Sequence, residues 1–348
     1  MIPRLDISFP LSRQWNYWFG KQYMPQDGEY LLNHARSGIV IALRAVLPHG
    51  GRVGVMAYNC HTVANAIVNA GCKPVFVDIT MDLHINIANL PADLDALIVT
   101  NLFGIRNDIA TIRKHCPNIF IIVDNAHGYG LPAEGDFSVY SINQGKFPAL
   151  GPGGLLYVNK NLLNTACIDN SQKSPKTIMQ YINEIYESLP GYGFIAQVNL
   201  FVQMLVKALA YSKLCYWFVR KLKKNIKPNV REQVVMKQMA YGIRRIYKAW
   251  LPNVEMEIAK QKRNAVKISE LGYKTIIGGN AFMAIIRTDD IASVKAEFAK
   301  RGIESETHFV HAIDWATEFG YQRASCPNSE RLTKELLMIP TYTRIEKK

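Results

Sequence analysis

The sequence has no segment that could span a membrane, no repeat and no stretch of low complexity. No run of about 18 apolar residues occurs in the 348-residue chain, so a transmembrane helix is not expected. Self-similarity at the periods of solenoids or propellers is missing as well. The first residues, MIPRLDISFP, lack the charged and then apolar pattern of a secretory signal. We therefore expect a globular, cytoplasmic protein.

Cysteine is scarce, and its spacing argues against both disulfides and a metal centre. The six cysteines include no Cys-x-x-Cys pair and lie far apart, at Cys60, Cys72, Cys116, Cys167, Cys215 and Cys326. A disulfide framework or a zinc site would show closer and more regular spacing. We expect reduced thiols and no bound metal.

The net charge is +13, but the excess is concentrated in one region. Residues 207–263 contain 15 basic and 3 acidic side chains, which gives +12, and the rest of the chain is nearly neutral. No motif that reads nucleic acid accompanies this charge. We therefore expect no nucleic-acid partner and treat the charge as a regional feature.

The first half of the sequence alternates short apolar segments with helical ones. Segments typical of strands lie at 52–57, 74–79, 96–102, 119–124, 137–142 and 155–158. A helical pattern at 62–70 ends at Gly71, a residue type that often terminates helices. This alternation predicts a mainly parallel sheet with helices on both faces. Ligands of such sheets bind at the carboxyl ends of the strands.

The pattern changes after residue 160 and again near residue 250. Helical periodicity replaces the strand signals from 161 to 227. A helix at 254–271, a strand at 281–287 and a helix at 291–301 follow. We predict an α/β fold of three parts. They are the main part of a large α/β domain (1–160), a helical, basic connecting region (161–250) and a small C-terminal α+β domain (251–348).

Polar residues and glycines stand at the ends of the predicted strands. Asp124 closes the segment 119–124, and Ser141 and Lys146 follow the next one in the run SINQGK. The run GPGG at 151–154 then leads into the strand at 155–158. Each feature alone is common in turns and helix caps. Their order along the chain makes the combination informative.

These residue types match the needs of pyridoxal phosphate. A buried carboxylate such as Asp124 can keep the pyridine nitrogen protonated. A lysine such as Lys146 can form a Schiff base with the cofactor and later act as a general base. Ser37 and Gly38, at the start of a helical run at 39–47, would present backbone N–H groups to the phosphate.

The same segments resemble the DegT/DnrJ/EryC1/StrS family of sugar aminotransferases, which are fold-type I enzymes that use pyridoxal phosphate. The similar segments lie at 57–67, 70–78, NLFG at 101–104, VDNAHG at 123–128 and 141–154. Shorter similarities follow at 301–303, 307–308, 326–330 and 339–342. The resemblance implies a large domain with a mainly parallel sheet, a smaller C-terminal α+β domain and a homodimer.

Several residue roles follow from the resemblance. Lys146 corresponds to the lysine that binds the cofactor covalently, and Asp124 to the aspartate that pairs with the pyridine nitrogen. Ser141 corresponds to a serine that contacts the phosphate. Ser37 and Gly38 correspond to the small residues at the start of the phosphate-binding helix.

The sequence departs from the family pattern at several of these positions. His127 stands where the family has glutamine, and either Cys60 or His61 lies near the place of the aromatic residue that covers the ring. His308 lies near a family histidine at the mouth of the site. The Asn-Tyr-Arg segment that a partner subunit contributes is not recognisable.

The resemblance implies an aminotransferase for a nucleotide-linked keto-sugar, with glutamate as the expected amino donor. The expected setting is surface-polysaccharide or glycan biosynthesis. Family members that act as dehydratases have histidine in place of the lysine, so Lys146 favours transamination. Two alternatives stay open at this point. One is a dehydratase or lyase on the same fold, and the other is a catalytically degenerate binding protein at a membrane.

The second alternative rests on residues 194–227. An apolar helical stretch there contains several aromatic residues and runs into a basic cluster, Arg220 to Lys227. Such a segment suits either peripheral contact with an anionic membrane, at its cytoplasmic surface, or packing against the body or a second subunit.

Overall fold

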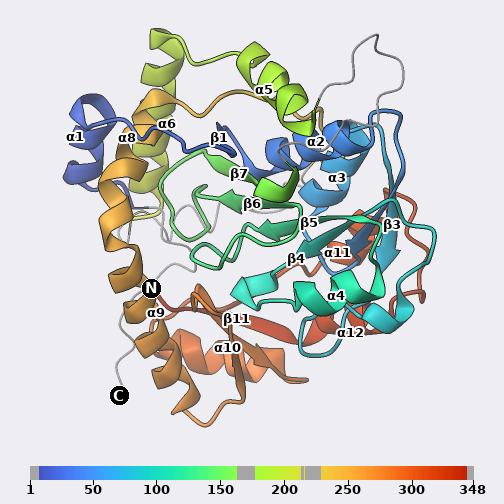
Figure 1. The fold of residues 1–348 in the computed structure, drawn as a ribbon. Helices are drawn as coiled ribbons and strands as arrows, with labels where there is room; N and C mark the ends of the chain where they lie inside the picture. The colour runs from blue at the N-terminus through green and yellow to red at the C-terminus, as the bar shows by residue number, and fades with distance from the viewer. Residues whose placement is uncertain (1–7, 163–176, 213–214, 216–228, 343–348) are drawn as a thin grey trace.

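The structure is a computed structural model, and it describes residues 8–162, 177–212, 215 and 229–342. These residues form two sheets with helices packed around them, as Figure 1 shows. The larger sheet lies in the upper part of that view, and the smaller one lies in the lower part.

The larger sheet has seven strands in the order β1-β7-β6-β5-β4-β2-β3. Strands β2 to β6 run parallel to one another, whereas β7 is antiparallel to both β6 and β1. Their bounds are β1 (Glu29–Leu32), β2 (Arg52–Met56), β3 (Lys73–Val77), β4 (Ala96–Thr100), β5 (Phe120–Asn125), β6 (Phe137–Ser141) and β7 (Gly154–Val158). The prediction of a mainly parallel sheet is confirmed.

Helices cover both faces of this sheet, as predicted. On one face, α2 (Ala35–Val46), α3 (His61–Asn69) and α5 (Ile178–Ser188) share an apolar core with inward side chains of the strands. On the other face, α4 (Ile109–His115) and α8 (Tyr241–Trp250) contribute to a second core. Short 3-10 turns lie at η1 (Ile87–Asn89), η2 (Leu102–Gly104) and η3 (Lys160–Leu162).

The smaller sheet is antiparallel, with the strand order β10-β11-β9-β8. Its strands are β8 (Thr275–Ile277), β9 (Met283–Arg287), β10 (Glu306–Thr307) and β11 (Leu336–Pro340). Its helices are α9 (Val254–Ser269), α10 (Ile291–Lys300), α11 (Ala312–Thr317) and α12 (Pro327–Glu335). The smaller α+β part expected at the C-terminus is therefore present.

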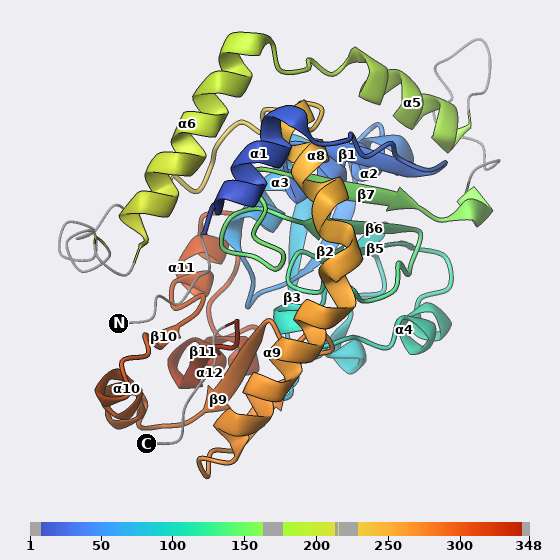
Figure 2. The same ribbon diagram turned by 90° about the vertical axis from the view of Figure 1, so that its left-hand side faces the viewer.

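Helices α8 and α9 connect the two sheets. Figure 2 shows them nearly in line, and η4 (Leu251–Asn253) joins them. Ile243, Ile246 and Trp250 of α8 are buried, at the three- and four-residue spacing that places side chains on one helix face. This buried face fixes the start of α9 relative to the larger sheet.

Helices α1 (Leu11–Phe19) and α6 (Phe194–Ala210) lie beside each other at the edge of the larger sheet. The Tyr17 hydroxyl of α1 donates a hydrogen bond to the Gln197 carbonyl at 2.8 Å. Apolar side chains of both helices stay exposed, among them Trp15 (66%) and Phe194 (74%). The basic cluster that follows α6 in the sequence lies outside the described residues. Of the helices described, none has the length and apolarity needed to cross a membrane.

Candidate active site

The carboxyl ends of four parallel strands meet at one edge of the larger sheet, and polar residues stand at each of them. Asn59 and Cys60 follow β2, Thr100 ends β4, Asp124 lies near the end of β5 and Ser141 ends β6. All of them line one cavity of about 210 Å³. Lys146 and His127 line the same cavity.

Asp124 is a buried carboxylate at the floor of this cavity. Its side chain is 3% exposed, and it accepts hydrogen bonds from the Ala126 amide at 2.9 Å and the Thr100 hydroxyl at 3.4 Å. Burial raises the pKa of Asp124, against the opposing effects of the Ala126 amide and Lys146. A buried carboxylate is stable in its charged form only with a cationic partner, and the cavity offers room for one.

Lys146 contacts His127, since Lys146 Nζ lies 2.6 Å from His127 Nε2. Burial, followed by the charges of Lys146 and His308, holds the pKa of His127 well below its usual range. The ring is therefore neutral. The Phe103 amide donates to Nδ1 at 3.3 Å, so Nε2 is the ring nitrogen that faces the Lys146 amine.

Aromatic rings hold His127 in place. The Phe103 ring stacks on one side at 5.4 Å and the Phe309 ring lies nearly parallel at 5.9 Å. The ring of His308 lies 5.5 Å from His127, although His308 does not line the cavity itself. The imidazole is thus confined to one orientation, with Nε2 toward Lys146.

Of the two adjacent residues expected near the cofactor ring, only Cys60 lines this cavity. Both Cys60 and His61 line a smaller hollow, and the His61 ring packs edge-on against Trp315 at 4.9 Å. Cys60 has extended backbone and precedes α3, and His61 is the first helical residue.

The helix beside the cavity begins earlier than the sequence suggested. Ser37 and Gly38 were expected at its start, but α2 begins at Ala35, after His34 in extended conformation. The Ser37 hydroxyl is fully buried and donates to the Asn33 side chain at 2.9 Å. Gly38 packs against the sheet, where a Cβ would lie 2.9 Å from Val139 Cγ1. Neither of the two lines the cavity.

Comparison with known proteins finds a matching family. The model of the DegT/DnrJ/EryC1/StrS aminotransferase family matches residues 30–197. The resemblance inferred from the sequence is therefore confirmed over these residues. The matched segment contains every element that lines the cavity except the one that carries Phe309. The expectations of an aminotransferase family and of pyridoxal phosphate as its cofactor are confirmed at the level of the family.

Solved structures with the same fold include two aminotransferases and one dehydratase. The sugar aminotransferase CalS13 from Micromonospora echinospora has a TM-score of 0.68 and 13% identity, covering 98% of this chain and 95% of its own. The aminotransferase TlmJ from Streptoalloteichus hindustanus has a TM-score of 0.68 and 13% identity, with 98% and 93% covered. The GDP-4-keto-6-deoxy-D-mannose-3-dehydratase of E. coli, solved with hydrated PLP, has a TM-score of 0.63 and 16% identity, with 96% and 87% covered.

The residues that line the cavity fit pyridoxal phosphate chemically. Asp124 supplies a buried carboxylate for a ring cation, and Lys146 supplies an amine. Ala35 and Arg36 line the cavity at the first turn of α2, where backbone N–H groups have no acceptor within the helix. These amides and the Arg36 side chain suit a phosphate.

Sequence reasoning missed several lining residues, including Ala35, Arg36, Asn59 and Phe309. An earlier helix start would have revealed the first two. His34 was missed as well, and burial, Arg36 and Lys207 lower its pKa to about 4, so the phosphate end of the cavity contains a neutral imidazole at neutral pH. Phe309 comes from the C-terminal part and has no local signal in the sequence.

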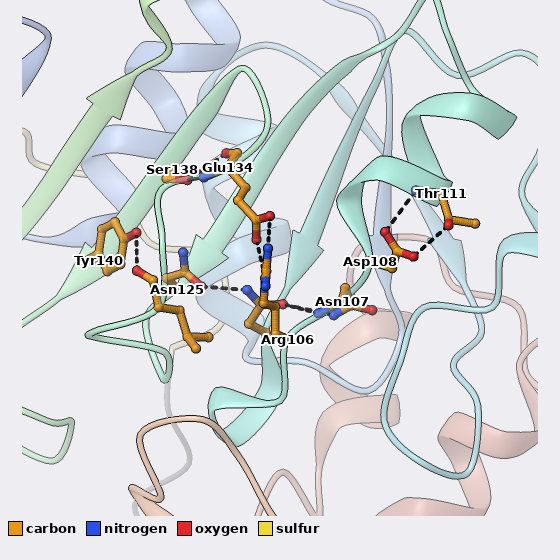
Figure 3. Close-up of polar contacts among 10 residues, drawn as sticks. Arg106, Asn107, Asp108, Thr111, Asn125, Glu134, Ser138 and Tyr140 are labelled. Atoms are coloured by element: carbon orange, nitrogen blue, oxygen red, sulfur yellow. Dashed lines mark hydrogen bonds and ion pairs between the residues drawn. The ribbon is translucent and has the colours of Figure 1, made fainter. Parts of the chain in front are cut away.

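A polar network supports the strand ends beside Asp124, and Figure 3 shows part of it. The Asn101 amide donates to the Asn125 side chain at 2.7 Å, and the Asn107 backbone amide donates to Asn101 Oδ1 at 2.8 Å. Arg106 Nε donates to Glu134 at 2.8 Å. These bonds join the loops that follow β4 and β5, so the position of Asp124 does not depend on β5 alone.

Gly154 determines how closely β7 approaches the start of α2. A Cβ at Gly154 would lie 2.2 Å from the Ala35 nitrogen, so Gly154→Ala must displace backbone at the expected phosphate site. We expect unfolding free energy to fall by about 1–3 kcal/mol and cofactor affinity to fall at least about tenfold, since the amides that bind phosphate move. Urea titration and cofactor titration measure the two effects. Gly191→Ala, where a Cβ meets nothing within 4 Å, is the control, and equal behaviour of the two variants would refute the assignment.

Proposed function

We propose that this chain transfers an amino group from an amino acid, glutamate, to a nucleotide-linked keto-sugar in surface-polysaccharide or glycan biosynthesis. The observation that carries the proposal is the contact of 2.6 Å between Lys146 and His127 beside the buried Asp124 carboxylate. Pyridoxal phosphate, when bound, supplies the ring that withdraws electrons from the reacting carbon.

The residues of the cavity then have distinct tasks. Asp124 stabilises a proton on the pyridine nitrogen, since its buried charge needs a cation. His127 Nε2 orients the Lys146 amine, which binds the cofactor and, once released from it, can take up and return a proton. Phe103 and Phe309 limit the access of water to the neighbourhood of this amine.

Retention of Lys146 supports transamination over the alternatives. In a dehydratase or lyase of the same fold, the sugar product would carry no amino group from glutamate. In a catalytically degenerate binding protein, the purified chain would show no cofactor absorbance. The two alternatives therefore differ from the proposal in the sugar product and in the spectrum of the purified chain.

Glutamate alone should change the absorbance of the bound cofactor, with release of one 2-oxoglutarate per active site. Subsequent addition of a keto-sugar nucleotide from a panel should restore the original spectrum and produce an amino sugar, detectable by mass spectrometry. The two half-reactions are measured by stopped-flow absorbance. No spectral change with glutamate or other amino donors, in protein with full cofactor content, would contradict the proposal.

We also propose that the chain works as a cytoplasmic homodimer, with the exposed apolar residues of α1 and α6 in contact with a partner surface. Large exposed apolar patches indicate an interaction site, and closed dimers are the commonest solution. Light scattering should give twice the chain mass of 39.3 kDa. Flotation with anionic vesicles tests the membrane alternative for 194–227, which predicts binding that weakens with salt.

A further inference from the structure

A second cavity shares Lys146 with the candidate cofactor site. It has a volume of about 370 Å³ and lies between the segment from Lys146 to Ala149, the start of β9 and one face of α9. Because Lys146 lines both cavities, a molecule bound in the second one is within reach of the amine that the proposed reaction uses.

The charged side chains of this second cavity are mostly basic. Arg13, Lys260 and Arg263 line it, whereas Glu257 is the single carboxylate among the described lining residues. Glu257 accepts a hydrogen bond from Trp250 Nε1 at 3.2 Å, which fixes it toward α8. The excess of positive charge favours an anionic ligand.

The two basic residues of α9 that line the cavity lie on one face of the helix. Lys260 and Arg263 are three residues apart, a spacing that places side chains side by side. Within the described part of the chain, neither is joined to a carboxylate by an ion pair. Arg13 donates to the Ala149 carbonyl at 2.9 Å, so a third cation is anchored next to the segment that carries Lys146.

Apart from Gln261, the rest of the cavity wall is apolar. Phe147, Met256, Phe282, Met283 and Tyr342 line it. Apolar and aromatic surface of this kind suits the faces of a sugar ring or a nucleobase, whereas charged groups of a ligand require the basic side.

We propose that Lys260 and Arg263 bind the phosphoryl groups of the nucleotide-linked substrate and thereby restrict the enzyme to phosphorylated sugars. This inference rests on the proposed function. Arginine and lysine are the preferred protein ligands of phosphate. A diphosphate carries two adjacent negative groups, which match two cations one helical turn apart better than the separated carboxylates of glutamate do.

Binding of UDP and of inorganic pyrophosphate to the cofactor-loaded protein tests this subsite directly. In isothermal titration, the double variant Lys260→Ala, Arg263→Ala should bind both ligands at least about tenfold more weakly, because two charge-assisted contacts are lost. Affinity of the unaltered protein should decrease with added salt. Lys262→Ala, on the same helix but outside the cavity, is the matched control and should bind as the unaltered protein does.

Measuring the two half-reactions separately distinguishes a phosphate subsite from a site for the carboxylates of glutamate. The same measurements test the subsite independently of the proposed function. The double variant should keep the glutamate half-reaction within about twofold and lose at least about tenfold in the apparent affinity for a keto-sugar nucleotide. Unchanged UDP binding in the double variant, or a defect confined to the glutamate half-reaction, would overturn the subsite. If UDP binds through these residues but no amino donor reacts with the unaltered protein, the subsite stands and the aminotransferase proposal fails.

Discussion

Replacement of Lys146 by alanine should abolish both covalent attachment of the cofactor and transamination. Lys146 lines both cavities and contacts His127, and no other lysine lines the cofactor cavity among the described residues. Removal of a nucleophile that also acts as general base should lower the rate by at least about 10³-fold. Both half-reactions should be affected, since each uses the same amine. Steady-state rates and the absorbance of the purified protein measure the loss.

Borohydride treatment identifies the attachment site without reference to activity. Reduction of the loaded protein should fix the cofactor to the peptide that contains Lys146, as mass spectrometry of a digest would show. Lys146→Arg keeps a positive charge but cannot bind the cofactor covalently, so it should behave as the alanine variant does. Lys160→Ala, outside this cavity, should label normally. Labelling of another lysine in the unaltered protein would disprove the assignment.

Asp124→Asn should lower activity strongly while it makes the cofactor-free protein more stable. Without its carboxylate, the site cannot hold a proton on the pyridine nitrogen, and we expect a loss of about 10²–10³ in rate. Burial raises the pKa of Asp124, so the folded cofactor-free chain binds this proton more tightly than the unfolded chain. In the unfolded chain the pKa of this carboxyl is about 4. As pH rises from that value to the higher pKa in the folded chain, the Asp124 carboxyl therefore lowers the free energy of unfolding more and more.

Urea unfolding at several pH values measures this difference. The stability advantage of Asp124→Asn over the unaltered protein, both without cofactor, should be near zero below pH 4 and grow as pH rises. With cofactor bound, the unaltered protein should become the more stable of the two. A ligand stabilises the folded state according to its affinity, and the cofactor should bind more tightly to the protein that has the carboxylate. A variant that is less stable at every pH, with normal turnover, would show that Asp124 has only a structural role.

The sequence could predict the strand ends but not the helix that faces them. Asp124 and Ser141 stand at the ends of apolar segments that read as buried strands. Since parallel strands end at the same edge of a sheet, the sequence placed both residues at one edge. The start of α2 was placed too late, because its N-cap residue, His34, is not a typical capping residue. Ser37 is a typical one, but its hydroxyl is bound to Asn33 instead. A short-range pattern cannot reveal that hydrogen bond.

Residues from the C-terminal part were the hardest to predict. Phe309 and the basic face of α9 reach the site through tertiary contacts, and neither carries a motif. His61 was a reasonable candidate beside Cys60, but the start of α3 between them directs its ring toward Trp315. Of two adjacent residues at a helix start, one can therefore line a site that the other does not reach, which spacing along the chain does not show.

The packing of α1 on α8 has a consequence for synthesis of the chain on the ribosome. Helix α1 ends at Phe19, but its packing partner α8 begins only at Tyr241. At about 5–20 residues per second, the nascent helix waits on the order of ten seconds or longer before that surface exists. Tyr17, fully buried in the finished protein, is accessible during this interval. The N-terminal segment thus exposes apolar side chains until α8 is made, and truncations before residue 250 should aggregate through it.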